Sequence, residues 1–334
     1  MIWLIVLAAV ASCLMTAVLR RYALSRSLLD IPNARSSHTL PTPRGGGLAF
    51  VFAFLAALLG LGWGGYVAPA VLTSVLGAGG LVALIGFMDD HGHIAARWRL
   101  LGHFAAAAWG LAWLGGMPPL SVFGLSLAPF WLGIAIGLLY LVWLLNLYNF
   151  MDGIDGIASI EAICVCMGGS LLYWLTGHAE AAWLPMLLAA TVAGFLCWNF
   201  PPARIFMGDA GSGFLGIVLG LLALVAGWVN PLLFWGWLIL SGVFVVDATF
   251  TLGRRLLRGD KVYQAHRSHA YQYAARRHGH HRPVSLAVAA INLVWLLPVA
   301  LAVVLLNLDG ALGTLIAYVP LIWLAITYQA GKPE

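Results

Sequence analysis

The chain has 334 residues, of which 62% are hydrophobic, 12% aromatic and only 9% charged, and its formal net charge is +5. A soluble domain of this length has no use for so much apolar surface, so the composition excludes an ordinary soluble protein and predicts a membrane protein.

Long apolar runs are the main signal along the chain. A bilayer core of about 30 Å takes roughly 20 apolar residues per helix. Eleven runs meet this requirement, and they lie near 2–19, 48–65, 67–87, 100–114, 128–147, 157–175, 182–198, 213–228, 231–252, 284–306 and 311–328. We therefore expect an all-α, polytopic membrane helix bundle with about 11 transmembrane helices, forming a single integral-membrane domain over residues 1–334.

The distribution of positive charge predicts the orientation. If the N-terminus is outside and each run crosses once, all 17 Lys and Arg fall in inside segments, as the positive-inside rule requires. The N-terminus is then outside and the C-terminus inside. The basic balance becomes a topology signal, and no nucleic-acid partner is expected. The most basic inside segment is the His-rich loop 253–283, so the working face should be cytoplasmic.

Five acidic residues occur in three motifs at that predicted face. The motif "GFMDDHGH" contains Asp89 and Asp90, "NFMDGIDG" contains Asp152 and Asp155, and "IFMGDAGSG" contains Asp209. Each acid alone would fit a helix cap, but carboxylates that converge repel one another unless a cation joins them. Oxygen ligands without nearby Cys favour Mg²⁺, with Mn²⁺ as the alternative. Since Mg²⁺ combines one or two carboxylates with substrate phosphates, a phosphorylated substrate is expected.

Glycines flank these acids and also follow Arg44 in "PTPRGGG". Gly46 and Gly47 permit close approach of the backbone to an anion. For Gly213 and Gly216, close packing between membrane helices is the favoured interpretation.

The last inside loop carries "AHRSHAYQYAARRHGHHR". His266 and His269 are three residues apart and would share a helix face. With Arg267 they fit contact with phosphate oxygens better than a zinc site, which lacks a firm spacing. Contact of this basic segment with anionic lipid is a serious alternative. Asp247, inside the ninth run, is interpreted as a buried ion pair or a loop anchor.

Five motifs, in order, carry a resemblance to a known family: "PTPRGGG", "GFMDD", "NLYNFMDGIDG", "WNFPPARIFMGDAGS" and "HRSHAYQ". The chain resembles the polyprenyl-phosphate N-acetylhexosamine-1-phosphate transferase superfamily, glycosyltransferase family 4, over nearly its whole length. The final motif is similar to that of the branch that initiates O-antigen. The His triplet of the peptidoglycan branch is absent, which argues against a MurNAc-pentapeptide donor.

The resemblance implies roles for particular residues. Asp209 and Asn149 match positions at the metal. Asp155 matches a residue that pairs with uracil, and Asn199 and Phe206 complete that nucleoside pocket.

Further roles concern the acids and the phosphates. By resemblance, Asp89, Asp90 and Asp152 match catalytic acids near the phosphates, with Asp89 as the candidate proton acceptor. Arg99 stands where other branches have a phosphate-binding Lys, which keeps the charge but changes the donor geometry. The remaining assignments are diphosphate contact by His266, Arg267 and His269, and a cleft loop formed by Arg44, Gly46 and Gly47.

The implied activity is transfer of an N-acetylhexosamine-1-phosphate, or a related amino-sugar phosphate, from a UDP-amino sugar to polyprenyl (undecaprenyl) phosphate. Mg²⁺ would be the cofactor and UMP the released product, and lipid-linked glycan synthesis, such as that of O-antigen, would start in this way. The resemblance places the chain in a bacterial inner membrane, among membrane lipids, and the family includes homodimers. The sequence leaves open the sugar, the prenyl length, and a direct or covalent mechanism.

A transporter of an ion or a lipid-linked sugar is the alternative from another class, because acids within membrane segments and Gly-broken helices suit transporters. The predicted position of the acids at one face, rather than at the midplane, argues against it. A CDP-alcohol phosphotransferase would need Ala-Arg soon after the first Asp-Gly, where this chain has Ala158-Ser159.

Overall fold

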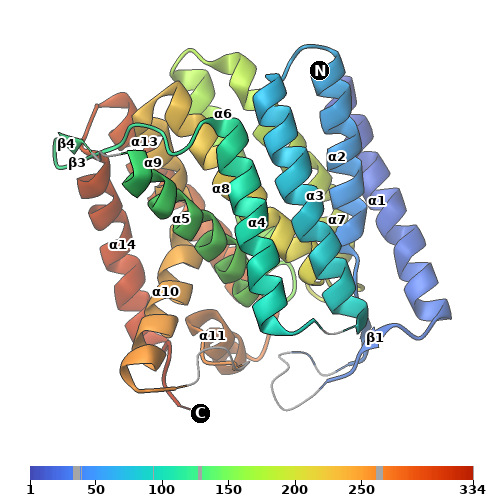
Figure 1. The fold of residues 1–334 in the computed structure, drawn as a ribbon. Coiled ribbons are helices and arrows are strands. Elements are labelled where there is room, and N and C mark those ends of the chain that lie inside the picture. Colours follow the sequence, from blue (N-terminus) through green and yellow to red (C-terminus); the bar gives the residue numbers. More distant parts are fainter. Residues whose placement is uncertain (33–37, 39, 93, 127–129, 261–265, 334) are drawn as a thin grey trace.

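The structure is a computed structural model that describes residues 1–334 except 33–37, 39, 93, 127–129, 261–265 and 334. Its helices run side by side along one direction in a bundle (Figure 1). The helices in the first half of the chain are α1 (Ile2–Ser25), α2 (Gly47–Trp63), α3 (Pro69–Gly92), α4 (Ala96–Leu114), α5 (Phe130–Met151) and α6 (Ile157–Leu175). The second half contains α7 (Trp183–Asn199), α8 (Asp209–Val229), α9 (Pro231–Leu240), α10 (Gly242–Leu257), α11 (Ala270–His278), α12 (His281–Ile291), α13 (Leu297–Leu305) and α14 (Gly310–Thr327).

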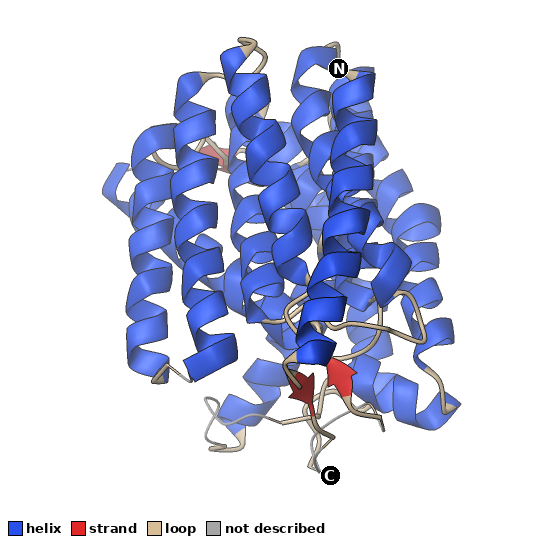
Figure 2. Cartoon of the chain, turned by 90° about the vertical axis from the view of Figure 1, so that its right-hand side faces the viewer, coloured by secondary structure: helices blue, strands red, loops and turns tan. Residues whose placement is uncertain are grey.

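Other regular structure is short. A 3₁₀ turn, η1 (Ala179–Ala182), precedes α7, and a π-helical segment, η2 (Asn292–Leu296), joins α12 to α13. Two antiparallel strand pairs are formed by β1 (Leu29–Asp30) with β2 (Thr42–Pro43) and by β3 (Ser121–Val122) with β4 (Leu125–Ser126). Figure 2 shows how little of the chain is strand and places the β1–β2 pair at the same end of the bundle as the C-terminus.

The all-α membrane bundle predicted from the sequence is confirmed. Among the described residues, eight helices are long and apolar enough to span a membrane, and α9 and α10 make a ninth if they count as one span bent by 69°. Each of the eleven predicted runs coincides with a helix or a bent pair. The number of crossings and the orientation of the termini remain predictions.

The centre of the bundle is α8, most of which is buried against α3, α5 and α9. Small residues let its neighbours approach. A Cβ on Gly216 would lie 2.6 Å from the Cα of Leu145 in α5, and one on Gly213 would lie 3.1 Å from a methyl of Val82 in α3. The packing interpretation of these glycines is therefore confirmed, and it matches how membrane helices bring backbones together.

One end of the bundle collects the polar segments. The C-terminus, α11 and β1 all lie at the lower end in Figure 1. The predicted loop 253–283 is partly helical, because it contains the end of α10, all of α11 and the start of α12; residues 261–265 of this loop lie outside the described residues. Because α11 begins at Ala270, His266 and His269 do not share a helix face, contrary to prediction, although their rings stack at 4.9 Å.

Candidate active site

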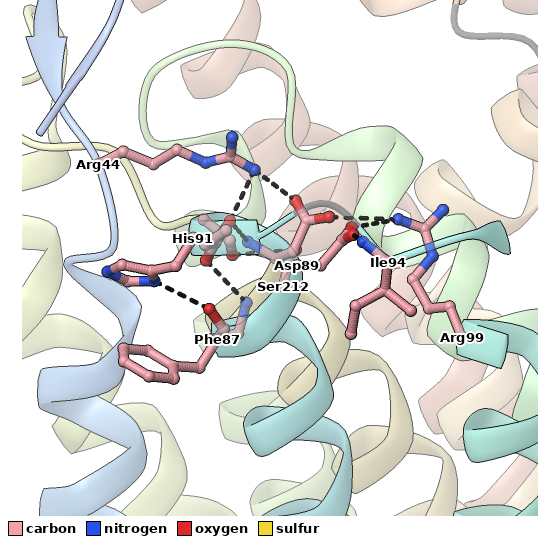
Figure 3. A network of polar contacts seen from close by, with 11 residues as sticks. Arg44, Phe87, Asp89, His91, Ile94, Arg99 and Ser212 are labelled. Atoms are coloured by element: carbon pink, nitrogen blue, oxygen red, sulfur yellow. Dashed lines mark hydrogen bonds and ion pairs between the residues drawn. The ribbon is translucent and has the colours of Figure 1, made fainter.

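Three of the motifs meet in a cluster of acids and arginines, which we define as Arg44, Asp89, Asp90, Arg99 and Asp209. Arg44 Nη2 lies 2.6 Å from Asp90 Oδ1 and 2.9 Å from Asp209 Oδ1. Arg99 Nη1 lies 2.6 Å from Asp89 Oδ2 and 3.6 Å from Asp209 Oδ2. The two guanidinium groups approach the acids from opposite sides (Figure 3). The predicted convergence of separate acidic motifs is therefore present in the structure.

The cluster is fixed to the start of α8. Asp90 accepts hydrogen bonds from the backbone N–H groups of Asp209 (3.1 Å) and Ala210 (3.4 Å). This contact needs a close approach of α3, and Gly86 permits it because a Cβ there would lie 2.5 Å from the backbone nitrogen of Ala210. A carboxylate at a helix N-terminus is also favoured by the helix dipole. Asp90 thus acts as a cap for a helix from another part of the chain.

Asp89 is held in a similar way. Its Oδ1 accepts a hydrogen bond from the backbone N–H of Ile94 at 2.7 Å, and its Oδ2 pairs with Arg99. Neither Asp89 nor Asp90 lines the polar cavity that is described next. These contacts favour a positioning role for both acids, and the predicted role of Asp89 as proton acceptor remains a prediction.

Beside the cluster lies a cavity of about 260 Å³, which we call the polar cavity. Its walls come from the β1–β2 region, the loop between α5 and α6, the start of α8 and the α11–α12 region. Among the lining residues are predicted site residues Arg44, Asn149, Asp152, Asp155, Asn199, Phe206 and Asp209. Residues from four distant stretches of the chain therefore share one space.

Asp152 is the least compensated carboxylate of the site. In the part of the chain that the structure describes, no hydrogen bond or ion pair reaches its carboxylate, whereas Asp209 has two arginines within 4 Å. Burial raises the pKa of Asp152 well above its usual value, and the negative charge of Asp209 raises it further. This carboxylate is suited to holding a proton or facing a cation.

Asp155, three residues later, points elsewhere because the chain between α5 and α6 is not helical. Its Oδ2 accepts a hydrogen bond from the backbone N–H of Ala203 at 3.0 Å, and its Oδ1 lies 3.1 Å from His281 Nδ1. Among the described residues, Asp155 therefore has partners that the Asp152 carboxylate lacks, although both residues line the polar cavity.

Asn199 and Phe206 support the same region. The side-chain oxygen of Asn199 accepts from the backbone N–H of Gly156 at 3.1 Å, and its amide donates to the carbonyl of Ile205 at 3.0 Å. Asn199 thus ties the Asp155 loop to the loop before α8. The ring of Phe206 lines the polar cavity and meets His38 edge-on, with centroids 4.8 Å apart.

The "HRSHAYQ" segment is placed differently from expectation. His269 is buried with Nδ1 3.3 Å from Asp247 Oδ1, and Asp247 also accepts from the backbone N–H groups of Ala270 and Tyr271 at 3.0 Å each. The interpretation of Asp247 as a loop anchor is confirmed. Burial, with the neighbouring His269, lowers the pKa of His266 to about 3, so that ring is neutral.

None of His266, Arg267 and His269 lines the polar cavity in the structure. Gln272 of the same segment does, together with His281, Asp30 and His38, and sequence reasoning assigned none of these four to the site. His281 belongs to the His-rich "HGHHR" stretch, but nothing in the spacing of that stretch could pair it with Asp155. Asp30 and His38 lie before the "PTPRGGG" motif and belong to no recognisable sequence pattern.

The oxygen atoms around the polar cavity can be compared with the ligands that a divalent cation requires. Within the described residues, no three His, Cys, Asp or Glu side chains group closely enough to cage a metal by themselves. However, Asp209, Asp152 and Asn149 supply two carboxylates and an amide oxygen to one space. Mg²⁺ is commonly held by one or two carboxylates with water and phosphate oxygens completing its shell. The donor set fits such an open site.

Comparison with known proteins places this site in a family. The model of the family described as "Glycosyl transferase family 4" matches residues 72–227. The phospho-N-acetylmuramoyl-pentapeptide-transferase of Chlamydia trachomatis is 33% identical over 264 residues, which cover 69% of this chain and 74% of that protein. The chain belongs to glycosyl transferase family 4. It is therefore a multi-pass membrane transferase, and membership in this family does not favour the transporter alternative.

Two further relatives match more of the chain. A probable undecaprenyl-phosphate N-acetylglucosaminyl 1-phosphate transferase of Bacillus subtilis is 27% identical and covers 84% of this chain and 79% of its own length. A decaprenyl-phosphate N-acetylglucosaminephosphotransferase of Mycolicibacterium smegmatis is 29% identical, with 81% and 75% covered. The matched region of the family description, 72–227, contains the acids from Asp89 to Asp209 but ends before α11 and α12.

Proposed function

We propose that the protein transfers an N-acetylhexosamine-1-phosphate from a UDP-sugar to a polyprenyl phosphate and releases UMP. The observation that carries the proposal is the meeting of carboxylates and arginines from separate motifs around one polar cavity at the end of a membrane bundle. The names of the family 4 relatives support the polyprenyl-phosphate acceptor and the phosphosugar product.

The nucleotide is proposed to lie against Asp155 and Phe206. Within the described ranges, each oxygen of the Asp155 carboxylate has one partner, and a carboxylate oxygen can accept a second hydrogen bond. An imide N–H of a uracil ring is such a donor. The aromatic face of Phe206, which lines the same cavity, supplies a surface on which a flat base can stack.

The diphosphate is proposed to lie between this subsite and the acid–arginine cluster. Arg44 and Arg99 offer donors that suit phosphate oxygens, and their positions are set by Asp89, Asp90 and Asp209. Asp209 and Asn149 would hold Mg²⁺, which, when bound, neutralises charge on the diphosphate. Asp152 lies beside them in the same cavity. Positioning and electrostatics provide most of the catalysis in phosphoryl transfer.

In the proposed reaction, an oxygen of the lipid phosphate forms a bond to the sugar-proximal phosphorus. The bond from that phosphorus to the bridging oxygen breaks, and UMP leaves with that oxygen. Where the lipid phosphate arrives with a proton, Asp152 is proposed to accept it in place of Asp89. Asp89 is paired with Arg99, whereas burial raises the pKa of Asp152 and makes its carboxylate the stronger base. The alternative is a covalent phospho-Asp intermediate.

The setting of the reaction also belongs to this proposal. The polar end of the bundle, with the basic α10–α12 region, is proposed to face the cytoplasm of a bacterial inner membrane, in accord with the positive-inside rule. N-acetylglucosamine is the first donor sugar to test, because two relatives carry it in their names. A role in starting O-antigen is retained as a proposal from the "HRSHAYQ" motif alone.

The test uses purified full-length protein with Mg²⁺, UDP-N-acetylglucosamine and undecaprenyl phosphate. We expect UMP release and a lipid-linked sugar diphosphate only when all three are present. UMP release without lipid would favour the covalent route. A panel of UDP-amino sugars that gives no product with either undecaprenyl or decaprenyl phosphate would overturn the proposal.

A further inference from the structure

The first turn of α12 holds the Asp155 loop, which lies more than a hundred residues earlier in the chain. His281 and Ser285 are four residues apart and so share one face of α12. His281 Nδ1 lies 3.1 Å from Asp155 Oδ1, and the buried Ser285 hydroxyl donates to the backbone carbonyl of Asp155 at 2.7 Å. The carboxylate and the backbone of one residue are therefore fixed by a single helix turn.

One ring nitrogen meets both the backbone and the carboxylate of Asp155. The backbone N–H of Asp155 donates to His281 Nδ1 at 3.3 Å, and Asp155 Oδ1 lies 3.1 Å from the same nitrogen. Nδ1 accepts the backbone N–H when it carries no hydrogen and donates to Oδ1 when it is protonated, so the imidazole holds Asp155 in either form. With Ala203 N–H on Oδ2, both carboxylate oxygens have a partner. The rotamer of Asp155 is thereby held, while a second lone pair on each oxygen stays available for a ligand.

His281 also stands at the junction of two cavities. It lines the polar cavity and a neighbouring cavity of about 510 Å³, and both cavities are also lined by Asp155, His38 and Phe206. Only 16% of the His281 side chain and 12% of the Asp155 side chain are exposed. A hydrogen bond to a charged group in such a sheltered place is stronger than one at an open surface.

Deeper in the bundle, α12 is attached to α6 a second time. Asn292, in η2 directly after α12, donates to Glu161 of α6 at 2.6 Å, and both side chains are fully buried. This contact fixes the position of α12 relative to α6, the helix that begins directly after the Asp155 loop. The first turn of α12 thus has a rigid support from which to hold Asp155.

We propose that His281 is a positioning residue of the nucleotide subsite: it orients the Asp155 carboxylate so that the uracil moiety of the donor is bound. This inference rests on the proposed function, because it assigns a role within that same site. It extends the site to α12, which lies outside the region 72–227 matched by the family description.

The experiment compares steady-state kinetics of His281→Ala with the wild-type protein, varying UDP-N-acetylglucosamine and undecaprenyl phosphate separately. Loss of a hydrogen bond to a carboxylate should raise KM for the nucleotide sugar about tenfold. KM for the lipid phosphate and kcat should change by less than about threefold, since neither depends on holding the base. UMP binding, measured by calorimetry, should weaken by the same factor as KM for the nucleotide sugar rises.

Two variants separate positioning from general damage. His281→Asn keeps an N–H donor near the position of Nδ1 and should recover most of the nucleotide-sugar KM, whereas His281→Ala should not. His278→Ala removes an exposed His of the same region, whose ring faces Tyr328 with centroids 6.5 Å apart, and should behave as wild type. If His281→Ala does not fold, the His281→Gln variant, whose donor reaches a different position, takes its place with the same expected KM change.

The outcomes distinguish the two proposals. If wild-type protein releases no UMP with any UDP-sugar, the proposed function fails. If wild type is active but His281→Ala matches it, or raises both KM values equally, the role of His281 alone is wrong.

Discussion

Asp209 and Asp152 line the same cavity, yet their surroundings differ in charge. Asp209 has two arginines within 4 Å and sits at a helix N-terminus, where the dipole favours an anion. Among the described residues, Asp152 has neither. Burial raises the pKa of both acids, but it raises that of Asp152 well above the usual value, and the charge of Asp209 adds to this. Compensated acids such as Asp209 keep a fixed geometry, whereas an uncompensated acid is ready to take up a proton or a cation. The difference divides the site into a positioned part and a reactive part.

The sharpest test of the positioned part is Asp209→Asn. This change leaves the shape of the side chain but removes its charge, so Arg44 and Arg99 lose their shared partner and the proposed Mg²⁺ site loses a carboxylate. The rate of UMP release should fall by about 10³-fold, as loss of several kcal/mol of electrostatic stabilisation implies. The measurement is initial rate against Mg²⁺ concentration, and the Mg²⁺ needed for half-maximal rate should rise.

The matched control is Asp309→Asn. Asp309 accepts a hydrogen bond from the Leu312 N–H at the start of α14 and lies far in sequence from the acidic motifs. The rate of UMP release by this variant should stay within about twofold of wild type, since an Asn side-chain oxygen can still accept the hydrogen bond from the Leu312 N–H. Near-normal activity of Asp209→Asn would show that the paired acids are structural only.

The reactive part is tested by Asp152→Asn, with an expected loss of roughly 10²-fold in kcat from a missing proton acceptor. The pH profile carries the sharper information. Because the pKa of Asp152 is raised, wild-type kcat/KM should fall as pH drops through a value above the usual 3.9 of an Asp, where the carboxyl becomes protonated. The Asn variant cannot titrate at this position and should lack that acidic limb. If the acidic limb of the pH profile is unchanged in Asp152→Asn, a group other than Asp152 titrates there.

A smaller effect on activity is expected from a change at Gly153, which packs closely against Tyr271 beside the Asp152 loop. A Cβ on Gly153 would overlap the Tyr271 hydroxyl, which donates to the Phe150 carbonyl at 2.9 Å. Gly153→Ala should displace the Asp152 loop and lower kcat about tenfold, because small misplacements of reacting groups are costly. Tyr271→Phe removes the obstructing oxygen, so the double variant should be more active than Gly153→Ala alone. A double variant that is no better would place the strain elsewhere.

Much of the architecture could be predicted because membrane helices can be recognised in a sequence as long apolar runs. The same reasoning placed Asp89, Asp152 and Asp209 at one end of the bundle, since spans of similar length put alternate loops on one side. The Asp247 anchor and the packing role of Gly216 also followed from the sequence. In contrast, the helix face expected for His266 and His269 was wrong, because the capping of α11 by Asp247 and His269 delays that helix until Ala270.

The sequence by itself determined the class of protein, the positions of the helices and the set of acids, because hydrophobic period, charge asymmetry and motif order are local properties of the chain. The tertiary structure alone decided which acid is paired with which cation, that Asp90 caps α8, and that His281 holds Asp155 across 126 residues. The physical reason is that a carboxylate's pKa and role depend on neighbours brought close by packing, and the spacing of residues along the chain does not specify those neighbours.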